Sequence, residues 1–569
     1  MTGSYSIGDY LIHSLAGRGI THIFGVPGDY ILNFYDRLTK SKISVVNTCD
    51  EQGAGFAADV YARIRGLGVV CITYGVGALK VINTTAQAYA EKSPVVVISG
   101  APGLKEQIKN PLLHHKVRDF DTQKKIFDQI TVASTVLDDS QTAAYEINRV
   151  ISAAMRFKRP IYIELPRDIV STTIAGQYRH PLDVQEHRQS DPNALREAIT
   201  EASNMINAAT RPVIIAGEEI HRFELQENLL ALIDKTQIPV AATILSKSVI
   251  SELHPLFIGI YEGAVGQEKA RQCVEFSDCL IILGATLSDI TLGMFTAQID
   301  QRRIIYVGAE KLSVMYHHHD NIEIQDFFDA LIDAPLARKQ KSILYSSYSL
   351  ATPAHKDLTI TSSLPKCTPG KKITVKYVFE YLNSTLTDDM IVLADVGDAL
   401  FAGADLIIRG NTRFLSPAYY ASLGFAVSAS IGAQLADQTL RPLVIVGDGA
   451  FQMTGMELST ALRYKLNPIV VVLNNGTYLT EQLMLDGAFN DLQPWNYSSI
   501  PQVIGGGQGF HIESEDQLNY AFSTALSQRN TYSVLDVRLE RNDKSPALDR
   551  LTKNLAKRFY HHHDPPKPV

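Results

Sequence analysis

The 569-residue sequence has little of what builds disulfide scaffolds, membrane spans or nucleic-acid-binding surfaces. It has five cysteines, without the spacing of a metal site, which favours reduced thiols in a cytoplasmic protein. No stretch approaches the ~18 apolar residues of a membrane-spanning helix, so we expect no membrane partner. Acidic residues (60) outnumber basic ones (53), which argues against nucleic acid as a partner. The cysteines are Cys49, Cys71, Cys273, Cys279 and Cys367.

The two ends of the chain and its histidine runs carry little signal. The N-terminal residues lack a basic start followed by an apolar core, so we expect no signal peptide. Three-histidine runs occur at His317–His319 and within Tyr560–His563, each followed by an aspartate. Neither run has the i, i+4 spacing of a helical metal site. We interpret both as plain surface segments, with a metal site as the alternative, and expect the proline-rich C-terminal tail to fray.

The residues that are abundant indicate a globular protein of several domains. Hydrophobic residues make up 45% and charged residues 20% of the chain, which excludes a disordered, collagenous or coiled-coil protein. At roughly 150 residues per domain, the length predicts three or four domains.

Short apolar runs alternate with helical patterns, which is typical of parallel sheets flanked by helices. The helical spacing is clearest in Glu51–Arg65. We therefore predict an α/β fold of three doubly wound parallel-sheet domains. The predicted strands are His22–Val26, Ser44–Thr48, Val69–Thr73, Val95–Ser99, Ile161–Glu164, Val213–Ala216, Leu280–Leu283, Ile304–Val307, Ile391–Ala394, Leu443–Val446 and Ile469–Leu473.

Changes in composition place the domain boundaries. The polar stretch Ser171–Pro192 and a second one rich in serine, threonine, proline and lysine interrupt the periodic pattern. The predicted parts are an N-terminal domain (1–175), a middle domain (190–337), a linker (338–372), a C-terminal domain (373–550) and a tail (551–569).

The predicted C-terminal domain, here called the third block, carries polar, glycine-rich segments after two consecutive predicted strands. Gly447–Ala450 precedes a helical pattern at Met456–Tyr464, and Asn474–Thr477 ends the next strand. Parallel strands bring their carboxyl ends to one edge of a sheet, where ligands bind. Helix N-terminal amides attract phosphate, and Asp448 and Asn475 offer oxygen ligands to Mg²⁺. Either segment alone is explained by a turn; together they predict a Mg²⁺-diphosphate clasp.

Together with motifs of the predicted N-terminal domain, here called the first block, this predicted clasp makes the chain resemble the thiamine-diphosphate-dependent 2-oxo acid decarboxylases of the pyruvate decarboxylase superfamily. The resemblance covers essentially the whole chain. The N-terminal motifs are Phe24–Asp29, Asp50-Glu51, Tyr61–Arg63, Thr73–Gly77, Ala88–Glu91 and His114-His115. The phenylpyruvate/indolepyruvate decarboxylase branch is the most similar, through Ala88–Gly103, Leu112–His115, Val446–Gly455 and Ala488–Leu492.

The resemblance implies catalytic roles in the first block. Glu51 would hydrogen-bond the N1′ nitrogen of the cofactor. Asp29, His114 and His115 would handle protons, since imidazoles titrate near working pH. Taken singly, each has a simpler explanation: an acid at a helix N-terminus, a turn residue, or surface histidines. Their joint presence favours decarboxylases over carboligating relatives.

The resemblance also implies cofactor contacts in the third block. Asp448, Asn475 and the Thr477 carbonyl would bind Mg²⁺. Leu423 would wedge between the two cofactor rings, the alternative being a core leucine of an alanine-rich helix. Ala421 would accept a hydrogen bond from the 4′-amino group. The other cofactor-binding positions are Val396, Gly397, Asp398, Gly447, Gly449 and Ala450.

Some positions depart from the family pattern or bear on the substrate. Asp398 replaces a threonine that many members carry near the diphosphate. A carboxylate beside phosphate is unfavourable, so we expect it to be turned away, protonated or used in regulation. Glu481 matches a glutamate that pyruvate decarboxylases place beside the substrate carboxylate, with a surface acid as the alternative. Ile290, Val396 and Thr480 match pocket positions of relatives. Ile290 and Thr480 are smaller than the residues that restrict some pyruvate-specific members, which favours a large apolar or aromatic substrate.

The predicted function is decarboxylation of phenylpyruvate, indolepyruvate or another large 2-oxo acid to an aldehyde and CO₂, using thiamine diphosphate and Mg²⁺. The alternatives are a branched-chain or pyruvate-type decarboxylase, an acetolactate-synthase-like carboligase, a silent paralogue and a nicotinamide dehydrogenase. Synthases lack the histidine pair, and no Gly-x-Gly-x-x-Gly follows a strand. Intact Glu51, Asp448 and Asn475 argue against a silent paralogue. By resemblance, the cofactor lies between the first block of one subunit and the third of another, which implies a homodimer at minimum and favours a homotetramer.

Overall fold

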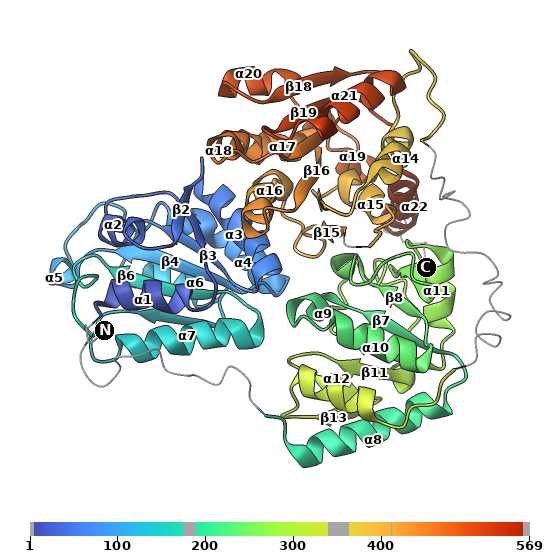
Figure 1. Ribbon diagram of the computed structural model, residues 1–569, viewed down its shortest axis with the longest axis horizontal. Helices are drawn as coiled ribbons and strands as arrows, with labels where there is room; N and C mark the ends of the chain where they lie inside the picture. Colours follow the sequence, from blue (N-terminus) through green and yellow to red (C-terminus); the bar gives the residue numbers. More distant parts are fainter. Residues whose placement is uncertain (1–4, 175–188, 340–363, 411, 561–569) are drawn as a thin grey trace, which may run out of the picture. The chain divides into compact units, whose positions relative to one another are not determined.

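The computed structural model describes residues 5–174, 189–339, 364–410 and 412–560, the last seven by their helical backbone only (Figure 1). This part of the chain contains three sheets and divides into two compact units. The first unit combines residues 5–174 with Tyr420–Leu440 and Thr454–Leu466. The second unit consists of the remaining described residues and holds the other two sheets.

The first unit is built on a parallel sheet with the strand order β2-β1-β3-β4-β6-β5. Its strands are β1 (His22–Gly25), β2 (Ser44–Asn47), β3 (Gly68–Ile72), β4 (Val95–Ala101), β5 (Ala133–Val136) and β6 (Ile161–Pro166). Its helices are α1 (Ile7–Ala16), α2 (Leu32–Thr39), α3 (Glu51–Arg65), η1 (Ala78–Val81), α4 (Ile82–Ala90), α5 (Leu104–Gln107), α6 (Thr122–Phe127), α7 (Ala143–Phe157), α16 (Phe425–Ala436), η4 (Gly455–Glu457) and α18 (Leu458–Arg463).

Helices α3 and α16 pack closely because small residues line their contact. A Cβ atom on Gly432 would lie 2.0 Å from the carbonyl oxygen of Ala57. Every residue of α16 is buried, so this helix depends on its neighbours for stability. Helix α3 starts at Asp50, whose side chain accepts a hydrogen bond from the amide of Gln52, and ends at Gly66 in the left-handed conformation.

The central sheet of the second unit has the order β13-β12-β11-β10-β7-β8-β9. Its strands are β7 (Pro212–Ala216), β8 (Val240–Ala242), β9 (Phe257–Ile260), β10 (Cys279–Leu283), β11 (Ile304–Val307), β12 (Leu312–Val314) and β13 (His317–His319). Its helices include α8 (Pro192–Ala208), α9 (Glu218–Arg222), α10 (Gln226–Thr236), η2 (Ile244–Ser246), α11 (Glu268–Glu275), η3 (Gln301–Arg303) and α12 (Ile324–Asp333).

At one edge of this sheet two expectations are wrong: that all strands are parallel, and that His317–His319 is a plain surface segment. Strands β12 and β13 run antiparallel, not parallel, because the short connections after β11 and β12 form hairpins. The run His317–His319 is therefore a strand and not a plain surface segment. The side chain of His319 is only 2% exposed.

The C-terminal sheet is parallel, with the order β15-β14-β16-β17-β19-β18. Its strands are β14 (Met390–Ala394), β15 (Arg413–Leu415), β16 (Arg441–Gly447), β17 (Ile469–Asn474), β18 (Gln508–Ile512) and β19 (Ser533–Arg538). Its helices are α14 (Val375–Thr385), α15 (Asp398–Ala404), α17 (Asp448–Thr454), α19 (Leu479–Met484), η5 (Ala488–Asn490), η6 (Tyr497–Ser499), α20 (Ile500–Ile504), α21 (Glu515–Ser527) and α22 (Pro546–Tyr560).

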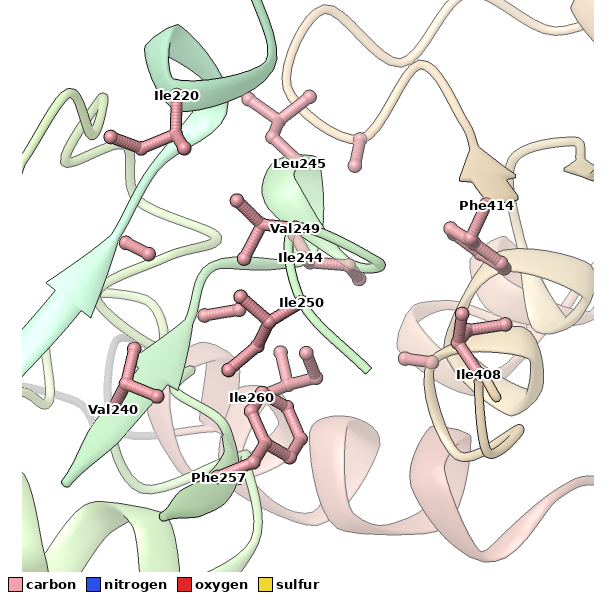
Figure 2. Close-up of a cluster of buried hydrophobic side chains, with 14 of the residues drawn as sticks. Ile220, Val240, Ile244, Leu245, Val249, Ile250, Phe257, Ile260, Ile408 and Phe414 are labelled. Carbon is pink, nitrogen blue, oxygen red and sulfur yellow. The ribbon is translucent and has the colours of Figure 1, made fainter. Parts of the chain in front are cut away.

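Within the second unit the central sheet and the C-terminal sheet share one hydrophobic core. Figure 2 shows Val249 and Ile250 of the central part with Ile408 and Phe414 of the C-terminal part among its side chains. Backbone hydrogen bonds join the two parts as well, for example from Glu252 to the carbonyl of Ile408 at 2.9 Å.

The predicted α/β class with three sheets is confirmed, and the five cysteines are free. The boundary predicted at residue 550 falls inside α22, where Leu551 and Thr552 are buried. Most of the predicted linker 338–372, much of the stretch Ser171–Pro192 and the histidines of Tyr560–His563 lie outside the described residues. Among the helices that the structure describes, none has the length and apolar character needed to cross a membrane.

Candidate active site

The first group of site residues, here called the strand-end half, lies where β14, β16 and β17 end. Strands β16 and β17 pair in parallel with Gly447 opposite Leu473, so the two segments after them emerge at one edge of the sheet. The sequence predicted this juxtaposition correctly. It placed the following helix at Met456–Tyr464, whereas α17 already begins at Asp448, so that backbone amides of the first turn lie at this edge.

Asp448 is the most constrained acid of the strand-end half. One carboxylate oxygen accepts a hydrogen bond from the amide of Gly449 (2.9 Å) and the other from the amide of Gly476 (2.7 Å). Burial raises the pKa of Asp448 to about 6, although these backbone hydrogen bonds favour its ionised form. The carboxylate thus ties the end of β16 to the segment after β17.

The segment after β17 is shaped by its own hydrogen bonds. The side-chain oxygen of Asn475 accepts a hydrogen bond from the amide of Thr477 at 3.2 Å. The Thr477 hydroxyl donates to Gln482 (2.9 Å) and contacts the carbonyl of Asn490 (3.1 Å). Gly476 has φ +73°, a conformation that favours glycine.

The other predicted glycine and alanine positions differ in the space around them. A Cβ atom on Gly447 would meet nothing within 4 Å, whereas one on Gly449 would lie 2.4 Å from the ring of Tyr478. Ala450 is buried in α17. Gly447 therefore leaves room for a ligand, and Gly449 allows close packing.

The third strand end, after β14, supplies Val396, Gly397 and Asp398. Gly397 has φ +90° and precedes α15. Asp398 accepts hydrogen bonds from the amide (2.9 Å) and the hydroxyl of Ser545, just before α22. Burial raises the pKa of Asp398 to about 6. Both oxygens of Asp398 are thus engaged by Ser545, and the expectation that the side chain turns away from a bound diphosphate stays a prediction.

The predicted substrate residues are only partly brought together. A Cβ atom on Gly397 would lie 3.6 Å from the hydroxyl of Thr480, so Thr480 lies beside the residue that follows Val396. Glu481 is exposed on the first turn of α19. Ile290 lies in the loop after β10 and packs on the shared core; no described contact joins it to the strand ends.

The second group of site residues, here called the Glu51 half, lies in the first unit. Glu51 is the first residue of α3 and its side chain is 12% exposed. Lys80 donates hydrogen bonds to Glu51 (2.7 Å) and Asp50, and these raise the pKa of Lys80. The ion pair with Lys80 is a feature that the sequence did not predict.

Glu457 is a second residue that the sequence analysis missed. Its carboxylate accepts hydrogen bonds from the backbone amides of Cys49 (3.1 Å) and Asp50 (3.0 Å), which directly precede Glu51. The hydroxyl of Thr460 donates to the same carboxylate, and burial raises its pKa. Glu457 follows the quoted segment Val446–Gly455 by two residues, but nothing in its local pattern points to residues 400 positions away.

A buried ion pair joins the motifs Tyr61–Arg63 and Ala88–Glu91. Arg63 contacts Asp59 and Glu91 at 2.8 Å each, with all three side chains at most 1% exposed. Glu91 also accepts a hydrogen bond from the amide of Tyr420 at 2.9 Å. This network fixes the start of the segment that holds Ala421 and Leu423.

That segment is a turn and not part of a helix. Ala421 has φ +58°, an uncommon conformation for a residue with a side chain. Ser422 is held by Asn83 at 2.7 Å. Leu423 is half-buried before the start of α16, so the alternative of a core leucine within a helix is wrong.

The predicted proton-handling residues do lie together. The Nε2 atom of His114 lies 2.8 Å from a carboxylate oxygen of Asp29. The ring of Tyr30 stacks on His114 with 4.8 Å between centroids. His115 contacts His114 edge-on, also at 4.8 Å. The three predicted residues form one cluster, with Asp29 and His114 exposed to solvent.

Both halves have the features of a site that receives a polar ligand. The ligands available in the strand-end half are oxygen atoms, which suit a hard cation such as Mg²⁺, and space is open at Gly447 and Gly476. In the Glu51 half, the Nδ1 atom of His115 is buried without a hydrogen-bond partner among the described residues. These features fit a diphosphate with its cation in the first case and a polar ring or substrate in the second.

Comparison with known proteins assigns each part of the chain. The chain matches three domains of the thiamine pyrophosphate (TPP) enzymes. Residues 5–125 match the N-terminal TPP binding domain, residues 199–334 match the central domain, and residues 395–537 match the C-terminal TPP binding domain.

Full-length relatives agree with these matches. The chain is 33% identical to the indole-3-pyruvate decarboxylase of Azospirillum brasilense, over 96% of this chain and 98% of that protein. It is 32% identical to the alpha-keto-acid decarboxylase of Mycobacterium leprae (96% and 95%). It is 29% identical to pyruvate decarboxylase 4 of Arabidopsis thaliana (96% and 91%).

Proposed function

The chain belongs to the thiamine-diphosphate-dependent 2-oxo acid decarboxylases, and we propose from this premise that its substrate is a large apolar 2-oxo acid such as phenylpyruvate or indolepyruvate. The products are the aldehyde with one carbon fewer and CO₂, and Mg²⁺ accompanies the cofactor. The observation that carries the decarboxylase chemistry is the contact of His114 with Asp29 in the same unit as Glu51.

Some of the candidate site residues would bind the cofactor, and others would transfer protons. Asp448, Asn475 and Thr477 would hold Mg²⁺ and the diphosphate, and Glu51 would hydrogen-bond the N1′ nitrogen. Bound thiamine diphosphate supplies the electron sink that loss of CO₂ requires. Because Lys80 already donates to Glu51, it would have to share that carboxylate with the cofactor.

The Asp29–His114 pair is suited to deliver the proton that completes the reaction. Loss of CO₂ breaks the bond between the carboxylate and the keto carbon, and the electron pair stays with that carbon. One proton added there gives the aldehyde. The 2.8 Å contact with the carboxylate orients the imidazole, and an oriented imidazole is a common general acid in enzymes.

Two observations favour a large substrate. Thr480 and Ile290 are modest in size at positions that resemble pocket-lining ones, and one full-length relative is named for indole-3-pyruvate. Relatives named for pyruvate and for alpha-keto acids also match over the same length, so pyruvate and branched-chain acids are the comparison substrates.

In the test, the purified protein is loaded with thiamine diphosphate and Mg²⁺. It is then given phenylpyruvate, indolepyruvate, pyruvate or a branched-chain 2-oxo acid as substrate. A coupled reductase reports the aldehyde. We expect kcat/KM for an aromatic acid to exceed that for pyruvate by about tenfold or more, since extra buried apolar groups favour the larger substrate. Preference for pyruvate would refute the substrate proposal, and no aldehyde from any acid would refute decarboxylation. A tightly bound flavin would favour a carboligase.

A further inference from the structure

A cluster of histidine and glutamate side chains lies far from the strand ends in sequence, on the edge of the central sheet. Glu197 and Glu201 are four residues apart on α8, so they share one face of this helix. His317 and His319 alternate on β13, so they share one face of the strand. Helix α8 packs against β12 and β13 (Figure 1).

The distances within this cluster are short. The Nδ1 atom of His317 lies 2.8 Å from one carboxylate oxygen of Glu201, and the Nε2 atom of His319 lies 3.3 Å from the other. The two imidazole rings are 4.1 Å apart. Single ligand atoms of Glu197, His317 and His319 all lie within 4.8 Å of one another.

The exposure of the four residues leaves one side of the cluster open. His319 is 2% exposed, whereas His317 is 47% exposed and Glu201 33%. A small ion can therefore enter from solvent and reach a buried imidazole. Ligand atoms of a tetrahedral zinc site lie about 3.3 Å apart at metal-ligand distances near 2.0 Å. Glu197, His317 and His319 are therefore within about 1.5 Å of this spacing, and Glu201 already contacts both histidines.

The chemistry of these ligands selects the kind of ion. Imidazole nitrogens suit zinc, copper or nickel, whereas Mg²⁺ prefers oxygen alone. Two carboxylates and two neutral imidazoles balance the charge of a divalent cation. Two of the ligands come from a helix and two from a strand more than 100 residues away, so a bound ion would hold α8 against the sheet edge.

We propose that Glu197, Glu201, His317 and His319 form a site for a divalent transition-metal ion, Zn²⁺ in particular, which is separate from the active site. His318 provides a matched control, because it lies between the two histidines and points to the opposite face of the strand.

The first test titrates Zn²⁺ into the protein loaded with thiamine diphosphate and Mg²⁺ and follows the heat of binding. The variants are His317→Gln, His319→Gln and the control His318→Gln. We expect the first two to lose one zinc site or weaken it by about tenfold or more, and the control to keep it. Zinc bound elsewhere, for example at Asp29, His114 and His115, persists in all variants. Identical isotherms for all proteins would overturn the proposal.

The second test keeps the proposal falsifiable if His319→Gln does not fold. Thermal unfolding with and without Zn²⁺ compares the wild type, His317→Gln and His318→Gln, because a ligand of the folded state raises Tm. We expect Zn²⁺ to raise Tm in the wild type and in His318→Gln, and to raise it less in His317→Gln. A crystal soaked with Zn²⁺ should give an anomalous peak between the four side chains. An equal rise in all three, or a zinc-loaded crystal without that peak, contradicts the site.

Discussion

Two buried aspartates show how single residues of one sheet edge acquire different tasks. Asp448 and Asp398 both have a pKa raised to about 6 by burial. Asp448 accepts backbone amides from two strand ends and keeps its position at the edge. Asp398 accepts both hydrogen bonds of Ser545, so its carboxyl serves to attach the start of α22.

The pH dependence of stability tests this role of Asp398. Its pKa in the folded protein, about 6, lies above the ordinary value of an aspartate. Between about pH 4 and 6 the folded state keeps a proton that the unfolded state has lost, so stability falls as the pH rises. Relative to Asp398→Asn, the wild type should lose about 2–3 kcal/mol across this window and nothing more above it.

Urea unfolding of both proteins without cofactor, from pH 4.5 to 7.5, measures the difference. Ser545→Ala serves as the companion variant, because it removes a hydrogen bond that lowers the pKa of Asp398 and should therefore extend the upper end of the window to higher pH. Parallel stability curves for the wild type and Asp398→Asn would show that the carboxyl does not titrate in this way.

At the level of elements, the start of α3 is held from another part of the chain. Glu457, in η4, accepts the amides of Cys49 and Asp50, and so positions Glu51 as the first helical residue. Asp50 caps the helix from within. The orientation of Glu51 therefore depends on a carboxylate that comes from the crossover between β16 and β17.

Replacing Glu457 by alanine should lower both stability and turnover. Two part-buried backbone amides would lose their acceptor, at a cost of roughly 1 kcal/mol each, and Glu51 would lose its fixed position. We expect kcat to fall at least about tenfold while KM changes little, since a misplaced group affects the reacting geometry first. Glu457→Gln, which keeps one acceptor oxygen, should recover part of the loss. Equal kcat in Glu457→Ala and the wild type would exclude a positioning role.

The elements that the sequence predicted are those with a strong local signal. Buried runs such as Ile304–Val307 and the small-residue helix Glu51–Arg65 coincide with β11 and α3. Half-exposed strands such as β5, β15 and β18 were missed because their patterns are weak. The buried strands β9 and β19 were missed as well, since a short apolar run does not by itself distinguish a strand from a buried helix.

Among site residues the same rule holds. Glu51, Asp448 and Asn475 belong to local motifs, so the sequence alone could single them out as candidates. Glu457 and Lys80 act through contacts that depend on the fold, so no spacing rule could reveal them.

At the level of the whole molecule, the two halves of the site belong to different compact units. The resemblance implies that a complete site combines the Glu51 half of one subunit with the strand-end half of another. This proposal can be tested by combining two inactive variants, because symmetric subunits exchange halves in a defined way.

Chains carrying Glu51→Gln and chains carrying Asp448→Asn, each inactive alone, should regain activity when co-expressed. A mixed dimer holds one doubly altered site and one intact site, so the purified mixed dimer should have about half of the wild-type activity per dimer. Turnover of the purified mixed dimer, selected by two different affinity tags, is the readout. If each site were built within a single chain, the mixed dimer would stay as inactive as its parents.

Turnover by a Glu51 variant tests most directly whether Glu51 acts in a decarboxylase site. Phenylpyruvate is supplied to the wild type and to Glu51→Gln at saturating thiamine diphosphate and Mg²⁺, and CO₂ and aldehyde are quantified together. We expect equal amounts of both products from the wild type and a rate at least about 100-fold lower from the variant, with its fold unchanged by circular dichroism. Wild-type protein that releases neither product, or a variant that keeps most of the rate, would contradict this role of Glu51.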